Sequence, residues 1–170
     1  ASDVYKRQAD RVPTEVMDIN ASVATLDSEA LLTVGHEHIQ QPLNRIAGVN
    51  FQRGSGQEYL PAIRSPVFTG PGGCGGLLVK EDGISLRAAG FCNLNELFEA
   101  HTEVASQIEV LKGAGTSIHG SNALHGVINV ITPDRASMNT ATLERMKSGS
   151  NRLKFTVNSG GESPVVFAGT

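Results

Sequence analysis

The sequence has no tryptophan, only two tyrosines and only two cysteines, and its lysines and arginines do not outnumber its acidic residues. The formal net charge of −3 offers no basic field, so we expect no nucleic-acid partner. No apolar run approaches the roughly 20 residues that a transmembrane helix needs. Because there is no CxxC motif and no histidine lies close to either cysteine, we expect no zinc site of the usual kind.

Glycine, by contrast, is abundant, with 19 residues in a chain of 170. This composition predicts many tight turns, and the length is sufficient for one domain with a core of its own. Residues 1–20 show neither the apolar segment of a signal peptide nor a clear periodicity. We expect them to form an extended or disordered lead-in.

Apolar periodicity predicts short elements along the first half of the chain. Asp27 is suited to cap a helix that Gly35 would end. A second helix is expected to begin near Gln41, with Ile39, Leu43 and Ile46 on one buried face. Alternation or apolar runs predict strands at residues 22–26, 49–53, 58–64 and 77–80, with a turn at 81–83 and a further helix capped by Asn93.

The most informative stretch is residues 108–132, IEVLKGAGTSIHGSNALHGVINVIT. An apolar run rich in β-formers opens it, and glycines at 113 and 115 interrupt that run. Residues 117–124 are expected to form a turn and a short helix, with Ser121 as the N-cap. A second buried strand follows at 127–131, and Pro133 closes the unit because proline cannot donate to a central ladder.

This stretch resembles the final motif of the plug domain of TonB-dependent outer-membrane receptors, where a strand of the type IEVLKG precedes GSNA and GVINVIT. Two further passages resemble the same domain. In one, a helix leads into a "PGVNV" strand and an "IRG" strand, although this chain has Ala47 and Ser65 where proline and glycine are usual. In the other, LLVKEDG resembles a "VLVLIDG"-like strand. The resemblance covers residues 21–132.

The resemblance implies an α+β fold, in which a plug domain has a small mixed β-sheet and short helices and is followed by the start of a transmembrane β-barrel. The plug is expected at residues 21–133 and a linker at 134–150. Leu153, Phe155 and Val157 alternate with polar residues, so residues 151–170 are predicted to begin the barrel. An edge strand of a soluble domain is the alternative for this segment.

The implied function is active uptake of a scarce solute, such as a ferric siderophore or cobalamin, with the plug gating the barrel lumen. The implied partners are the energy-transducing protein TonB and the receptor's own β-barrel, in the outer membrane of a Gram-negative bacterium. No enzymatic activity and no cofactor are expected. We see no convincing TonB box; TEVMDI at residues 14–19 is the nearest extended piece.

The resemblance also implies roles for particular residues. Arg64 and Lys112 match basic positions that lock the plug to carboxylates of the barrel wall, and Glu109 is a further candidate for this network; ordinary exposed strand ends are the alternative. A loop facing the external ligand, or else a plain surface loop, is expected at Thr69, Gly70, Pro71, Gly72 and Gly73.

The two cysteines, Cys74 and Cys92, are either reduced and unrelated or paired, and the receptor resemblance favours a disulfide. Such a bond would close a loop of about 18 residues and contribute about 3 kcal/mol in the chain-entropy model.

Other kinds of site are weaker candidates. His36 and His38 would share one face of a strand and bind a metal, but solvated loop histidines are the expectation. Ser121 has His119 and His125 nearby, yet no acid completes a hydrolase triad. The glycine-rich loop lacks the GK[ST] ending of a nucleotide-binding loop. The main rival to a receptor is a stand-alone soluble periplasmic binding domain of plug-like fold.

Overall fold

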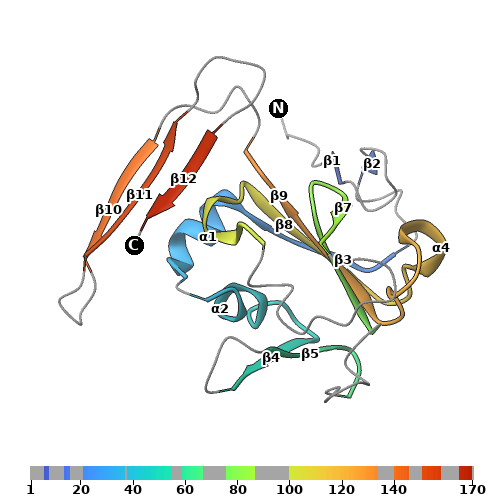
Figure 1. Ribbon diagram of the computed structural model, residues 1–170. Coiled ribbons are helices and arrows are strands. Elements are labelled where there is room, and N and C mark those ends of the chain that lie inside the picture. Colours follow the sequence, from blue (N-terminus) through green and yellow to red (C-terminus); the bar gives the residue numbers. More distant parts are fainter. Residues whose placement is uncertain are drawn as a thin grey trace.

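The computed structural model describes residues 21–36, 38–54, 59–66, 76–86 and 100–133, and the strand backbone at 6–7, 14–15, 140–145, 151–157 and 165–169 (Figure 1). Among these residues no helix is both long enough and apolar enough to cross a membrane. The predicted ligand-facing loop at 69–73, the two cysteines and the helix expected after Asn93 fall outside the described residues.

A five-stranded mixed sheet forms the centre of the described structure (Figure 1). Its order is β3 (Val23–Asp27), β8 (Gln107–Lys112), β9 (Gly126–Ile131), β6 (Leu77–Glu81) and β7 (Ile84–Ser85). Neighbours pair antiparallel except for β6 and β9, which are parallel. The small mixed sheet predicted from the sequence is therefore confirmed.

Short helices accompany the sheet: α1 (Ser28–Val34), α2 (Gln40–Leu43), η4 (Thr102–Val104) and α4 (Thr116–His119). The carboxylate of Asp27 accepts a hydrogen bond from the N–H of Ala30 at 2.8 Å, which caps α1 as predicted. Gly35 ends the same helix in the left-handed conformation, at φ 52°. The second helix is shorter than expected, because turns replace the α-helix between α2 and Ile46.

The core lies on one face of the sheet. Ile108 and Val110 of β8 and Ile128 and Val130 of β9 point to this face and are fully buried. They pack with residues of α1, α2 and the separate hairpin of β4 (Val49–Arg53) and β5 (Tyr59–Ile63). Burial of this apolar surface is the main favourable contribution to folding. The predicted buried face of the second helix is confirmed, with Ile39, Leu43 and Ile46 all in the core.

An asparagine connects α2 to β4. The Asn44 side chain donates from Nδ2 to the carbonyl of Phe51 at 3.0 Å, and its Oδ1 accepts from the Phe51 N–H at 2.6 Å. The amide thus satisfies both backbone groups of one strand residue, as a neighbouring strand would. This contact places the helix against the hairpin and was not predicted from the sequence.

The turn between β6 and β7 follows the sequence prediction. Asp82 and Gly83 both have positive φ, at 49° and 81°. Two such residues make a two-residue hairpin loop whose twist matches that of the strands. The Asp82 carboxylate also accepts hydrogen bonds from the N–H and hydroxyl of Thr132, so the turn is fixed to the end of β9.

The structure corrects the sequence interpretation of the loop between β8 and β9. The short helix is α4, and Ser121 lies in an exposed turn after it and caps no helix there. Gly120 and Asn122, at φ 91° and 73°, adopt left-handed conformations that are incompatible with a continuing helix. Gly126 is the first residue of β9.

Three strands follow the sheet in sequence: β10 (Thr140–Arg145), β11 (Asn151–Val157) and β12 (Val165–Gly169). They form an antiparallel meander. The strand predicted from the alternation at 153–157 is present as β11, and β12 also lies within residues 151–170, but β10 lies within the stretch predicted to be a linker. In the lead-in, β1 (Lys6–Arg7) pairs antiparallel with β2 (Thr14–Glu15). The domain boundaries themselves stay a prediction.

Candidate functional site: two cations at one end of the sheet

Two basic residues that are distant in sequence meet around Ser22, just before β3. Arg64 follows β5, and its Nη2 donates to the Ser22 hydroxyl at 2.9 Å. Lys112 ends β8, and its main-chain N–H donates to the Ser22 carbonyl at 2.8 Å. The two residues predicted to lock the plug are therefore neighbours of one serine.

The backbone fixes the direction of Arg64. Arg64 has φ 49°, a left-handed conformation that costs a non-glycine residue free energy. Its N–H donates to the carbonyl of Gly48 at 2.8 Å. A Cβ at Gly48 would lie 3.2 Å from Cγ of Arg64, so glycine allows the arginine side chain to lie against this turn.

Among the described residues, the side-chain hydrogen bonds of both cations go to neutral oxygens. Arg64 bonds to a hydroxyl, and Nζ of Lys112 donates to the carbonyl of Ala47 at 3.4 Å. Arg64 is exposed and Lys112 half-buried. These oxygens orient the two side chains without neutralising their charge, so this end of the sheet is suited to receive carboxylates from another surface.

Glu109, the third residue predicted for this network, lies apart from the other two. Side chains alternate along β8, so Ile108 and Val110 enter the core while Glu109 faces the opposite side of the sheet. Glu109 is only 4% exposed, and its Oε1 accepts from Nε2 of Gln107 at 2.8 Å.

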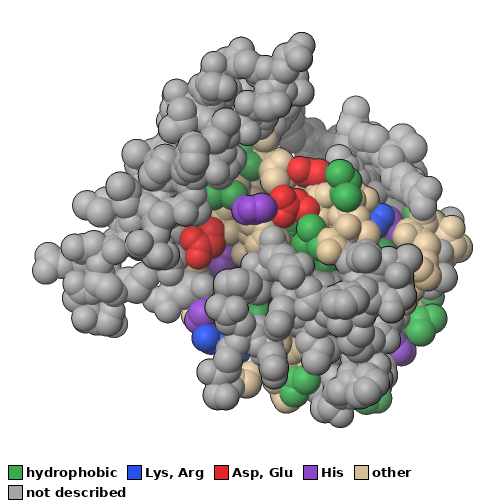
Figure 2. All heavy atoms as spheres, in the orientation of Figure 1, with side chains coloured by type: hydrophobic (Ala, Val, Ile, Leu, Met, Phe, Trp, Pro, Cys, Tyr) green, Lys and Arg blue, Asp and Glu red, His purple; other side chains and the backbone are tan. Residues whose placement is uncertain are grey.

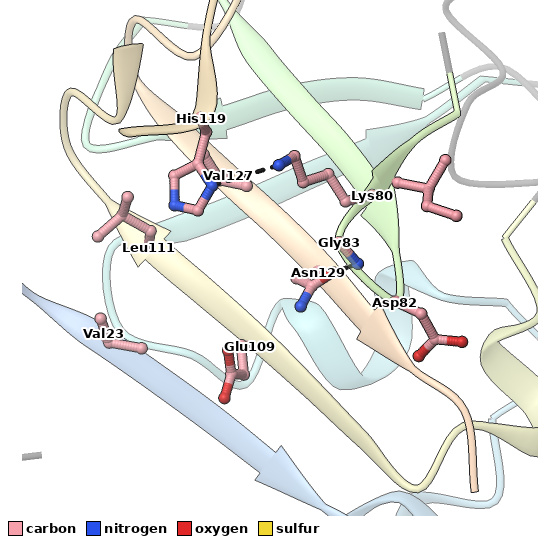
Figure 3. A pocket seen from close by; sticks show the side chains of 10 residues that line it. Val23, Lys80, Asp82, Gly83, Glu109, Leu111, His119, Val127 and Asn129 are labelled. Carbon is pink, nitrogen blue, oxygen red and sulfur yellow. Dashed lines mark hydrogen bonds between the residues drawn. The ribbon is translucent and has the colours of Figure 1, made fainter. Parts of the chain in front are cut away.

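A cavity of about 420 Å³ lies on the face of the sheet that carries Glu109 (Figure 3). Lys80 and Asn129 also line it, and Nζ of Lys80 lies 3.3 Å from Nδ1 of His119. This site was not predicted from the sequence. Its one signal was a lysine within the otherwise apolar run LLVK, because a charge in a buried strand needs a partner.

The histidines are placed differently from the sequence expectation. His36 is buried, with Nε2 3.4 Å from the Thr102 hydroxyl, and is not a solvated loop residue. Tertiary contact between the end of α1 and η4 buries it. His38 is half-buried. Within the described part of the chain, no three histidine, cysteine, aspartate or glutamate side chains gather as a metal site.

An exposed histidine joins η4 to the end of β6. His101 Nδ1 lies 2.9 Å from Oε1 of Glu81, and the His101 N–H donates to Oε2 of the same carboxylate at 2.9 Å. Figure 2 shows acidic side chains and a histidine side by side near the centre of the face of the molecule that it draws. Because the His101 side chain is 69% exposed, water screens the pair and its contribution to stability is small.

Comparison with known proteins bears on the identity of this fold. The family model of the TonB-dependent Receptor Plug Domain matches residues 15–127. The vitamin B12 transporter BtuB of Vibrio vulnificus (strain CMCP6) is 24% identical over 154 residues, which are 90% of this chain and 24% of the transporter. The chain thus spans about a quarter of the length of that curated relative.

Solved structures show the same fold. The pyoverdine outer membrane receptor FpvA of Pseudomonas aeruginosa PAO1, bound to pyoverdine, matches with a TM-score of 0.69 and 17% identity, over 91% of this chain and 22% of the receptor. The ferric yersiniabactin uptake receptor FyuA of Yersinia pestis matches with a TM-score of 0.65 and 19% identity, over 81% and 21%.

Proposed function

The chain belongs to the family of TonB-dependent receptor plug domains, and we propose that it closes the barrel lumen of an outer-membrane receptor during active uptake of a scarce solute. A ferric siderophore or cobalamin is the proposed class of solute. The named relatives support this class, since one is a vitamin B12 transporter and another a ferric yersiniabactin uptake receptor. We propose no enzymatic activity for the chain.

The observation that carries the proposal is the pair of cations at Ser22. Arg64 and Lys112 are oriented by neutral oxygens at one end of the sheet. Carboxylates on an inner barrel wall would form ion pairs with these two side chains, and exclusion of water from the contact would strengthen the pairs. Glu109 is proposed to make a separate contact with the barrel wall, because it lies on the face of the sheet opposite the core and apart from Arg64 and Lys112.

The meander of β10, β11 and β12 is proposed to supply the first strands of the barrel. Antiparallel neighbours with alternating apolar and polar residues are the pattern of such strands, and Leu153, Phe155 and Val157 follow it on β11. TonB is the proposed periplasmic partner, and it would pair with an extended segment near the N-terminus by strand addition. The ligand-facing loop at residues 69–73 and the bond between Cys74 and Cys92 also remain proposals.

Uptake by the full-length receptor tests this function. The complete reading frame would be expressed in a Gram-negative host that lacks its own receptors, with and without a working TonB. We expect labelled cobalamin or a ferric siderophore to accumulate only when TonB is present. TonB-independent accumulation, or a protein found only in the soluble periplasmic fraction, would contradict the proposal, and the second result would favour the stand-alone binding domain.

A further inference from the structure

A row of polar side chains crosses the sheet on the face opposite the core. The register pairs Lys80 of β6 with Asn129 of β9, and Asn129 with Glu109 of β8. The next row on the same face is apolar, with Leu111 paired to Val127. An amine, an amide and a carboxylate therefore stand in line beside an apolar strip.

These polar residues are buried, although two of them have ionisable side chains. Lys80 is 8% exposed, Glu109 4% and Asn129 9%. Removing such a group from water is costly unless it has charged or hydrogen-bonding partners, and Lys80 and Glu109 each have a polar neighbour, His119 and Gln107 respectively. A row of this kind is unusual for a sheet face that serves packing alone.

The central amide has a fixed orientation. Oδ1 of Asn129 accepts from the N–H of Gly83 at 3.0 Å, which leaves its NH2 group directed away from the β6–β7 turn. In Figure 3 that nitrogen is turned toward the side of the cavity on which Glu109 lies. Asp82, which also lines the cavity, uses both carboxylate oxygens on Thr132 and belongs to the turn.

The row has a basic side chain at one end and an acidic side chain at the other. One end carries the ammonium of Lys80, 3.3 Å from His119 Nδ1, and the other carries the carboxylate of Glu109. Two strand spacings separate their backbones, which is roughly 10 Å. The cavity lies over this span, and its volume of about 420 Å³ is in the range of sites for small molecules.

We propose that this cavity binds a small zwitterionic molecule. Its anionic end would accept hydrogen bonds from Lys80, its cationic end would donate to Glu109, and an apolar spacer would lie on Leu111 and Val127. One positive and one negative end in the site match such a ligand better than a phosphate or a metal ion, which carries charge of one sign. This site is separate from the cation pair at Ser22 and does not depend on the transport proposal, with which it shares only Glu109.

Nuclear magnetic resonance titration of the chain with 6-aminohexanoate tests the site, because this probe carries both charges on an apolar spacer. We expect saturable shifts of the Gly83, Leu111 and Val127 backbone amides and of the Asn129 side-chain amide. Hexanoate and hexylamine, each with one charged end, should bind about tenfold or more weakly. Equal binding of all three probes, or no saturable shift at these amides, would overturn the proposal.

Matched variants test which residue binds each charged end of 6-aminohexanoate. Lys80→Met should weaken binding of 6-aminohexanoate about tenfold, and Glu109→Gln should do so at the other end. Arg45→Met and Glu29→Gln, both at exposed positions, remove charges of the same signs outside the cavity and should leave the affinity unchanged. If the cavity variants bind as the wild type does, the proposal is wrong; the comparison of probes on the wild-type chain decides it even where a variant does not fold.

Discussion

Arg64 and Ser22 are joined by their side chains, with Nη2 of the arginine 2.9 Å from the serine hydroxyl. The carbonyl of the same serine accepts the N–H of Lys112. One small residue before β3 thus contacts the side chain of Arg64 and the backbone of Lys112, which lie at the ends of two different strands. The two cations can contribute to the stability of the isolated chain and, separately, to docking of the plug against the barrel wall. The two contributions can be measured independently.

In the isolated chain, Arg64→Met and Lys112→Met should each change the free energy of unfolding by less than about 0.5 kcal/mol, because the side-chain contacts are at the surface. Urea denaturation measures this. In the full-length receptor, the double variant should loosen the plug and sensitise cells to large antibiotics. Arg45→Met, an exposed charge elsewhere, is the control. Unchanged sensitivity of the double variant would argue against a locking role.

Gly126 should not tolerate a side chain. A Cβ there would lie 2.7 Å from the carbonyl oxygen of Leu111 and 2.9 Å from Cδ1 of Ile63, and the first is a backbone atom of the paired strand. We expect Gly126→Ala to lower the free energy of unfolding by about 2 kcal/mol or more, as overpacking does. Gly54→Ala, which would meet nothing within 4 Å, should stay within about 0.5 kcal/mol in the same denaturation experiment.

Asn44 should stabilise the fold through its two bonds to Phe51. Asn44→Ala removes both and leaves a backbone N–H and a carbonyl of β4 without this partner, so the free energy of unfolding should fall by about 1–3 kcal/mol. Asn50→Ala, at an exposed position on the same strand, is the matched control. Equal unfolding free energies for the two variants would show that the Asn44 bonds contribute nothing.

Stability should decline in alkaline solution because of Tyr59. Burial raises the pKa of its hydroxyl above the ordinary 10.0, and the nearby Arg53 guanidinium opposes part of that rise. Above about pH 10 the unfolded chain loses this proton before the folded chain does, so the free energy of unfolding falls as pH rises. Below that pH the contribution is fully present.

Tyr59→Phe should flatten this alkaline decline, measured by denaturant unfolding at about pH 9 and about pH 11. Tyr5→Phe changes the chain's other tyrosine and should leave the decline in place. A decline that survives Tyr59→Phe would assign the effect to other groups.

Local signals in the sequence were sufficient for many elements. Asp27 and Gly35 marked the ends of α1, and the Asp82–Gly83 pair marked the hairpin of β6 and β7. In these cases the deciding interaction lies within a few residues, as a cap or a required positive φ. The loop after β8 was misjudged because Ser121 resembles an N-cap, whereas left-handed Gly120 ends the helix before it and left-handed Asn122 is incompatible with a helix after it.

By itself the sequence determined strands β3, β4, β5, β6, β8 and β9, both caps of α1, the turn at Asp82 and Gly83, and the resemblance to the receptor plug, because these depend on side-chain pattern and backbone preference over short distances. Only the tertiary structure decided that Arg64 and Lys112 share Ser22, and that Glu109 stands in a row with Asn129 and Lys80. Strand pairing sets the row and the contact of Lys112 with Ser22, whereas packing of the β4–β5 hairpin into the core places Arg64. The partner of a strand is chosen by how the whole core packs, and no local pattern of residues records that choice.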